Sequence, residues 1–175
     1  MKKVKYFWIF IFPFVLGCHY IFPTTSKKPV KEKPTLAGTW KLMNYWGTDQ
    51  AGKVYYPMGD SVIGQMQLDT SGRFTIQIMD AGRSMLSYSD PYYAPDNQIR
   101  IAFLGYTGYY GTYSVDNSKR LLILQVKGAS LPNWIGTQQI RGLRWKGDSL
   151  SLSQKATRIN GITMQQFSFW IREPD

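Results

Sequence analysis

Short runs in which polar and apolar residues alternate recur along most of the chain, separated by residues typical of turns. Residues 38–48 form the first run, and later runs at 62–69 and 73–80, 109–116 and 120–128, and 137–145 and 149–155 lie in pairs around short turns. The last pair meets at Asn160-Gly161, the strongest short-range signal for a β-hairpin. Repeated hairpins predict an all-β domain, an antiparallel up-and-down meander of about eight to ten strands closed into a barrel or folded into a sandwich.

One segment between two predicted strands has a different pattern. Ile99, Ala102 and Phe103 recur at helical spacing, and Pro95-Asp96 suits the start of a helix with Asp96 as its N-cap. The β-branched residues of this segment leave a strand as the alternative. We expect a short helical insertion near residues 95–106, within a long connection of the kind that often forms a lid or a functional loop.

The first and last predicted strands contain residues that suit a closing contact. Alternation places Trp40, Asn44 and Trp46 on one face of residues 38–48, while Trp170 and Arg172 share a face of the last strand. A barrel seals by pairing its first and last strands. Arg172 is then expected to lie over the indole of Trp40, a cation–π contact of about 1–2 kcal/mol. We assign these two residues to barrel closure.

These residues carry a resemblance to a known family. Gly38 and Trp40 with a late Arg172 resemble the lipocalin signature, and "AGTWKL", "YYPMGDSVIGQMQLDTSGRFTIQIM", "GYYGTYSVD", "LPNWIGTQQIRGLRWKGDSLSLS" and "FWIR" resemble successive blocks of the bacterial and fungal lipocalin-like domain family. The resemblance spans about Leu36 to Arg172 and implies a small β-barrel with a helical insertion, but little about activity. Many members carry a His before the "PNW" block, where this chain has Leu124-Gln125, which removes the basis for proton transfer there.

The N-terminal residues read as a targeting segment. Residues 1–17 have a basic start and an apolar run from Tyr6 to Leu16, the length of a signal-peptide core. Gly17 precedes Cys18, the chain's single cysteine, and this arrangement resembles a bacterial lipobox, which implies that Cys18 is lipidated. The alternative is an uncleaved membrane anchor that continues to Phe22. We expect a lipoprotein signal peptide at 1–17, a flexible basic tether at 18–34 and one domain at 35–175.

The charge of the chain supports this division. The formal net charge is +10, but three lysines lie in residues 1–17 and four lysines against one glutamate lie in residues 19–34, which leaves the domain at +4 with no basic run. We therefore expect a membrane partner, through the lipidated Cys18 and an anionic lipid surface, and no nucleic-acid partner. His19 after the cysteine suits the outer membrane of a Gram-negative-type cell envelope, and we expect a monomer.

The sequence offers little catalytic chemistry. The only histidine, His19, lies in the tether, and neither a metal-ligand spacing nor a nucleophile motif nor a phosphate-binding loop is present. Asp80 and Tyr113 are the only candidates for acid–base work. We therefore expect no metal and no cofactor, and we assign no catalytic residue.

Residues that could hold a ligand are better represented. In residues 137–145, Gln139 and Arg141 share a face with Leu143 and Trp145, so both polar side chains are expected to point inward. A buried arginine needs a partner, which an anionic or carbonyl-bearing ligand would supply; the alternative places Arg141 at the barrel rim. Trp134 is either a ligand contact or a plug of the barrel end. The candidate ligand-binding residues are Asn44, Trp46, Tyr113, Trp134, Gln139, Arg141 and Trp145.

Three functions of different classes follow. The first is a membrane-anchored protein that binds a small apolar or aromatic ligand in the barrel. The second is a filled barrel that serves as a structural or interaction component of the cell envelope. The third is a cofactor-free isomerase or cyclase, for which the only support is analogy of fold.

Overall fold

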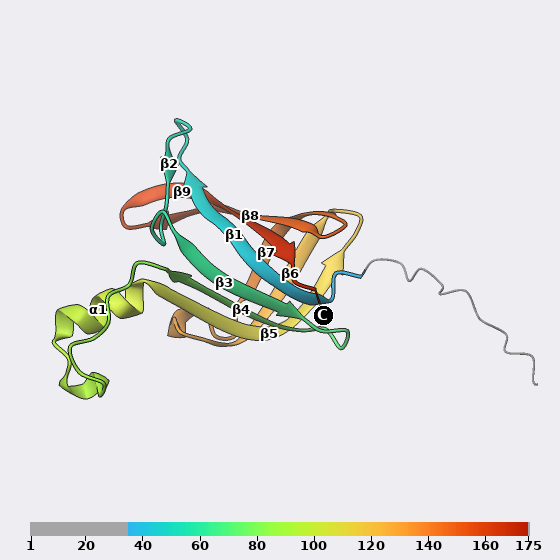
Figure 1. Ribbon diagram of the computed structural model, residues 1–175. Coiled ribbons are helices and arrows are strands. Elements are labelled where there is room, and N and C mark those ends of the chain that lie inside the picture. Colours follow the sequence, from blue (N-terminus) through green and yellow to red (C-terminus); the bar gives the residue numbers. More distant parts are fainter. Residues whose placement is uncertain (1–34, 175) are drawn as a thin grey trace, which may run out of the picture. The chain divides into compact units, whose positions relative to one another are not determined.

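The computed structural model describes residues 35–174, and these residues form a closed antiparallel β-barrel of eight long strands (Figure 1). This confirms the predicted fold class. The barrel strands are β1 (Gly38–Thr48), β3 (Val62–Leu68), β4 (Arg73–Asp80), β5 (Tyr106–Asp116), β6 (Leu121–Ala129), β7 (Gln138–Lys146), β8 (Ser149–Ile159) and β9 (Ile162–Arg172). The two-residue strand β2 (Val54–Tyr55) pairs with the end of β1.

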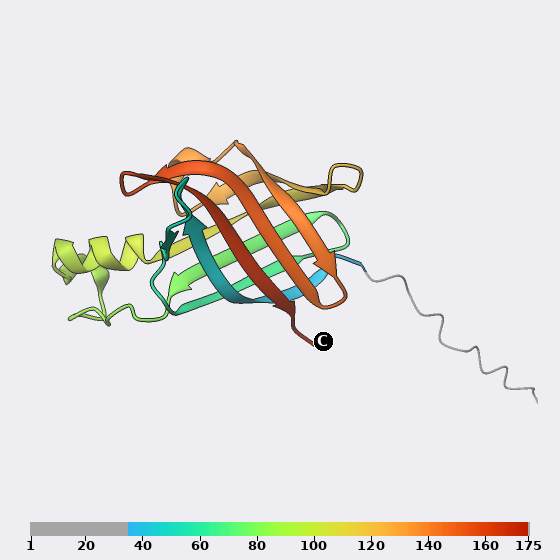
Figure 2. The ribbon, with the colours of Figure 1, turned by 90° about the horizontal axis from the view of Figure 1, so that it is seen from above.

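Each barrel strand pairs with its sequence neighbour, and β1 pairs with β9 to close the ring. The closing register runs from Trp40 opposite Arg172 to Thr48 opposite Gln165. The first and last strands therefore meet as predicted, and the sandwich alternative is excluded because one continuous sheet curves through all eight strands (Figure 2).

A β-bulge in β1 changes which residues face inward. The register of β1 against β9 shifts between Leu42 and Asn44. Trp40 and Leu42 face the interior before the shift, whereas Tyr45 does so after it, because Tyr45 pairs with the buried Ser168. The added residue moves the rest of the strand to the opposite face.

This bulge corrects the inward placement expected for Asn44 and Trp46. Asn44 is exposed, and Trp46 stacks on its cross-strand partner Phe167 with ring centroids 5.5 Å apart on the outer face.

The two ends of the barrel differ. The turns after β3, β5 and β7 lie at the same end as the start of β1 and the end of β9, and we call this the closed end. There the Arg172 backbone N–H donates to the Asp148 carbonyl at 2.9 Å. The opposite, open end carries the β1–β3 connection, the long β4–β5 excursion (residues 81–105), the β6–β7 loop and the β8–β9 turn; α1 extends from this end (Figures 1 and 2).

Trp40 and Arg172 hold the closed end together, as the sequence predicts. The Arg172 guanidinium lies 4.3 Å from the Trp40 ring and donates to the carbonyls of Ala37 at 2.7 Å and Thr35 at 2.6 Å. The Trp40 indole is fully buried, and its Nε1–H donates to the Leu36 carbonyl at 3.0 Å. Burial of an aromatic side chain of this size contributes about 3 kcal/mol or less, so this contact is a substantial part of the stability of a small barrel.

The core fills the barrel toward the closed end. The largest fully buried side chains come from six of the eight strands and interdigitate on the barrel axis: Trp40, Trp170, Met66, Ile76, Leu122, Leu124, Leu150 and Val126. Alternation in each strand places these side chains inward, as the period of two requires.

The excursion contains the 3₁₀ helix η1 (Pro91–Tyr93) and the helix α1 (Asp96–Leu104), so the predicted helical insertion is confirmed. The expected cap is corrected: Pro95 occupies the N-cap position without a side-chain hydrogen bond, and Asp96 is the first helical residue. No residue of α1 is buried. Within residues 35–174, no helix has the length and the hydropathy needed to cross a membrane.

Candidate functional site

A cavity of about 740 Å³ occupies the open half of the barrel. Its floor and walls include Ile76 and Ile78 of β4, Leu152 of β8 and Trp170 of β9, all of them buried inward-facing positions. Leu104 and Met58 contribute from the two connections at the open end. A cavity of this size and largely apolar lining is typical of small-molecule sites.

All buried polar residues of the described chain line this cavity. They are Thr107 of β5 and Gln166 and Ser168 of β9. The inward-facing residues of β9 alternate from Met164 through Gln166 and Ser168 to Trp170. Two polar side chains therefore occupy inward positions between two apolar ones. A buried polar group is destabilising unless it is hydrogen-bonded. Each of these side chains therefore needs a partner, either within the protein or on a bound molecule.

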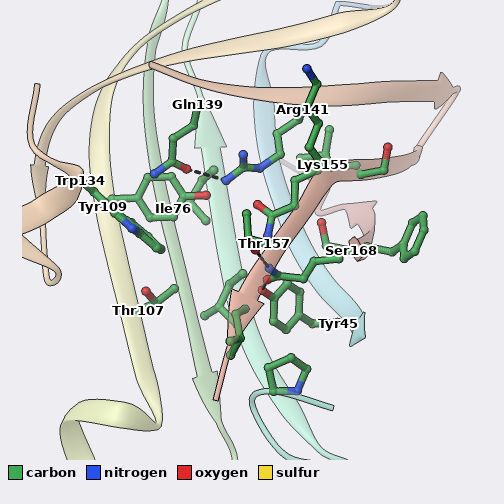
Figure 3. A pocket seen from close by; sticks show the side chains of 18 of the residues that line it. Tyr45, Ile76, Thr107, Tyr109, Trp134, Gln139, Arg141, Lys155, Thr157 and Ser168 are labelled. Atoms are coloured by element: carbon green, nitrogen blue, oxygen red, sulfur yellow. Dashed lines mark hydrogen bonds between the residues drawn. The ribbon is translucent and has the colours of Figure 1, made fainter. Parts of the chain in front are cut away.

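A hydrogen-bonded chain crosses one wall of the cavity. The Tyr45 hydroxyl donates to Oε1 of Gln166, and Nε2 of Gln166 donates to Oγ1 of Thr157 at 2.8 Å (Figure 3). Burial raises the pKa of the Tyr45 phenol far above its ordinary value, nearby Tyr109 raises it further, and the charge of Arg141 opposes both. Tyr45 is therefore a neutral hydroxyl at physiological pH.

A second polar group lies on β7, on another wall. Gln139 and Arg141 point into the cavity from alternate positions, and Nη2 of Arg141 donates to Oε1 of Gln139 (Figure 3). Both side chains are half-buried. The ion pairs formed within residues 35–174 are Lys119–Asp116 and Arg172–Asp148, so Arg141 has no carboxylate partner there.

Aromatic rings form a third wall. Trp134 of the 3₁₀ helix η2 (Pro132–Trp134) meets Tyr109 edge-on, with ring centroids 5.2 Å apart, and Tyr109 meets Phe74 edge-on at 5.7 Å. Trp134 and Tyr109 line the cavity, and Figure 3 shows both beside Ile76. Trp134 thus forms part of the cavity wall in the open half and packs against the core through Tyr109.

The structure brings together three of the seven candidate ligand-binding residues, since Trp134, Gln139 and Arg141 all line the cavity. Tyr113 and Trp145 lie on the inner face but in the filled half. The Tyr113 hydroxyl donates to the Asp69 carbonyl at 2.8 Å in the β3–β4 turn, and Nε1 of Trp145 donates to the Gly147 carbonyl at 2.8 Å in the β7–β8 turn. Both residues pack against the core rather than the cavity.

The remaining candidates lie elsewhere. Asn44 and Trp46 are on the outer face of β1, and the lipidation candidate Cys18 is outside the described residues. Sequence reasoning missed Tyr45, Thr107, Gln166 and Ser168. The polar residues at alternate positions before Trp170 were a readable signal for Gln166 and Ser168, whereas nothing marked the bulge that turns Tyr45 inward.

The two residues considered for acid–base work do not line the cavity. Asp80 accepts a hydrogen bond from the Gly82 backbone N–H at 2.7 Å at the start of the excursion. Tyr113 has a pKa raised by burial and by the charge of Asp69, which keeps its hydroxyl protonated. Among residues 35–174, no group of three or more His, Cys, Asp or Glu side chains is arranged to hold a metal ion.

Comparison with known proteins agrees with this architecture. A family model described as a lipocalin-like domain matches residues 37–172, which confirms the resemblance seen in the sequence. The chain is also 37% identical over 86 residues to the 4'-hydroxy-3'-methoxypropiophenone carrier protein of Aspergillus oryzae, an alignment that covers 45% of this chain and 78% of that protein.

Proposed function

We propose that this chain, which belongs to the lipocalin-like domain family, binds a small apolar or aromatic molecule in the cavity at the open half of its barrel. One observation carries the proposal: the barrel interior is hollow where its three buried polar residues lie and filled elsewhere. Interior polar groups beside an apolar cavity are the arrangement by which proteins orient a bound small molecule.

The walls suit a ring-containing or branched ligand. Trp134 and Tyr109 offer an edge-to-face aromatic surface, and Ile76 and Leu152 offer aliphatic contacts. Aromatic side chains contribute large contact areas to binding at little entropic cost. The Aspergillus relative, named as the carrier of an aromatic compound, supports the same ligand class for this chain.

The other two functions have less support. A filled barrel acting only through its surface is hard to reconcile with a 740 Å³ cavity. An isomerase built on Asp80 or Tyr113 lacks the required geometry, since neither side chain lines the cavity where a substrate would lie.

We further propose that the barrel is held at a membrane of the cell envelope through a lipid on Cys18. The support is the basic start, the apolar run and the Gly17-Cys18 pair at its end. Replacement of Cys18 by Ser is expected to move the protein from the membrane fraction to the soluble fraction. Retention of Cys18→Ser in the membrane fraction would favour the uncleaved anchor instead.

Native mass spectrometry of the full chain, purified from its own host in detergent, tests the binding function. We expect a co-purifying small molecule whose extraction changes the tryptophan emission. A ligand-free mass, together with emission that does not respond to a panel of fatty acids, quinones and aromatic acids, would exclude the proposal.

A further inference from the structure

Two groups of polar side chains in the cavity differ in how far their hydrogen bonds are satisfied within the protein. In the first group, Gln166 of β9 bonds to Tyr45 of β1 and to Thr157 of β8, and Ser168 accepts from Nε1 of Trp170 at 2.8 Å. These four side chains need little from a ligand. The Gln139–Arg141 pair on β7 is different, because most of its hydrogen-bonding capacity is left over.

The hydrogen-bonding groups of Gln139 and Arg141 that remain without a partner are all donors. A guanidinium has five N–H donors and no acceptor, so Gln139 must present its amide oxygen to Arg141. That orientation turns the Gln139 NH₂ group toward other partners. Arg141 makes one further contact, a long 3.4 Å hydrogen bond to the Ile140 carbonyl. The pair therefore offers the cavity several N–H donors and lacks a free strong acceptor.

The charge of the cavity has the same sign throughout. Arg141, Lys155 and Arg158 line it, and no carboxylate does within the described part of the chain. Lys155 and Arg158 are exposed at the rim, where solvent screens them, whereas Arg141 is half-buried and has lost part of its hydration. A partly desolvated cation without an anionic partner attracts one, and the planar fork of arginine matches a carboxylate in a bidentate manner.

We propose that the ligand is a monocarboxylate with an apolar body, whose carboxylate lies on Arg141 and Gln139 and whose body lies against Trp134, Tyr109 and Ile76. Figure 3 shows Gln139 and Arg141 on one side of the cavity, with Trp134, Tyr109 and Ile76 beside them. This rests on the proposed binding function and names the chemistry that the site selects. A neutral ester or ketone would satisfy fewer of the donors and none of the charge.

The test compares matched acids and esters. Cinnamate and methyl cinnamate, and decanoate and methyl decanoate, are titrated into the full chain in detergent at pH 7 while tryptophan emission is followed. We expect each acid to bind at least about tenfold more tightly than its ester, as a charge-assisted contact requires. Equal affinities of acid and ester would overturn the carboxylate inference and leave the binding function standing. If none of the four compounds binds and no small molecule co-purifies, both the carboxylate inference and the proposed binding function are excluded.

Variants of the β7 residues test which side chains cause the preference for acid over ester. Arg141→Gln is expected to abolish the difference in affinity between acid and ester, whereas Arg144→Gln, on the outer face of the same strand, is expected to keep that difference. Gln139→Glu places a carboxylate beside Arg141 and is expected to abolish the preference with the guanidinium still present. A preference that survives both Arg141→Gln and Gln139→Glu would show that the carboxylate lies elsewhere and would overturn the assignment.

Discussion

At the scale of the residue, two arginines show how the same side chain can be structural or available for binding. Arg172 is satisfied by two backbone carbonyls, the Trp40 ring and Asp148, whose Oδ1 lies 3.4 Å from its Nε. Arg141 has one side-chain partner and faces a cavity. The sequence predicted both positions, because each lies on the inward face of a strand with strong alternation. It could not tell how many partners each would find, because those of Arg172 include Thr35, Ala37 and Asp148, which are distant in the sequence.

Gly38 shows why the signature at the start of the domain needs a glycine. Its φ is +143°, and a Cβ there would collide with Nη1 of Arg172. Gly38→Ala is expected to lower the free energy of unfolding by about 3 kcal/mol or more, because the strained backbone adds about 1–3 kcal/mol to the loss of the Arg172 contacts. Urea unfolding followed by tryptophan emission measures the change.

Gly52 is the matched control for this substitution. Its φ is +80°, but nothing lies within 4 Å of the added Cβ. Gly52→Ala therefore isolates the backbone term and is expected to lower stability by only about 1–2 kcal/mol. If the two variants were equally destabilised, steric displacement of Arg172 would not explain the glycine.

At the scale of the element, the bulge in β1 marks the limit of reasoning from alternation. The period of two correctly placed Trp40 inward, but one extra residue after Leu42 reverses the faces of Asn44, Tyr45 and Trp46. Nothing in the composition of the strand announces the bulge, because both faces of residues 43–46 carry residues that suit either environment. Sequence analysis therefore predicted the strand and its partner β9, but missed its contribution to the cavity.

The turns are stabilised by aspartates whose pKa values respond to folding. Asp69 accepts from the Arg73 backbone N–H at 2.8 Å, and this bond lowers its pKa; Ser118 donates to Asp116 at 2.6 Å with the same effect. Because each carboxylate has a lower pKa when folded, the unfolded chain binds more protons in acid. The stabilisation is therefore present above the ordinary aspartate pKa and is lost as pH falls through the folded value.

We expect the free energy of unfolding to fall as the pH is lowered below about 4. In Asp69→Asn the amide keeps the acceptor oxygen but does not titrate, so this variant is expected to show a shallower fall. Urea unfolding at a series of pH values measures the slope, with Asp60→Asn as the control for removal of one carboxylate. A steeper fall for Asp69→Asn than for the parent chain would contradict the assignment.

Arg83 connects the start of the excursion at the open end to its end. Arg83 donates to the Ala102 carbonyl at 3.3 Å and lies 5.6 Å from the Tyr106 ring, which joins the start of the excursion to its end. Arg83→Ala is expected to raise amide hydrogen exchange throughout residues 81–105 while the barrel strands keep their protection. Arg100→Ala, an exposed position on α1, is the control and is expected to leave exchange unchanged. Unchanged exchange in Arg83→Ala would mean that other contacts hold the excursion.

At the scale of the whole molecule, the barrel is divided along its axis. Core side chains fill the closed half, and the open half is hollow. This division explains why the candidate site was predicted only in part. Alternation gives the face on which a residue lies but not its depth along the axis, so Tyr113 and Trp145 were placed on the correct face and in the wrong half. Depth depends on strand tilt and register, which arise from the pairing of all eight strands.

Tryptophan emission can test this division of the barrel into a filled and a hollow half, because the five tryptophans of residues 35–174 lie in different parts of it. Trp134 and Trp170 line the cavity, Trp40 and Trp145 lie toward the closed end, and Trp46 is on the outer face. We expect Trp134→Phe to remove the largest share of any ligand-induced change in emission, because its ring stands at the cavity wall. Trp46→Phe and Trp145→Phe are expected to leave that change intact. If either of these two abolished it, the ligand would lie outside the open half, and the cavity would not be the binding site.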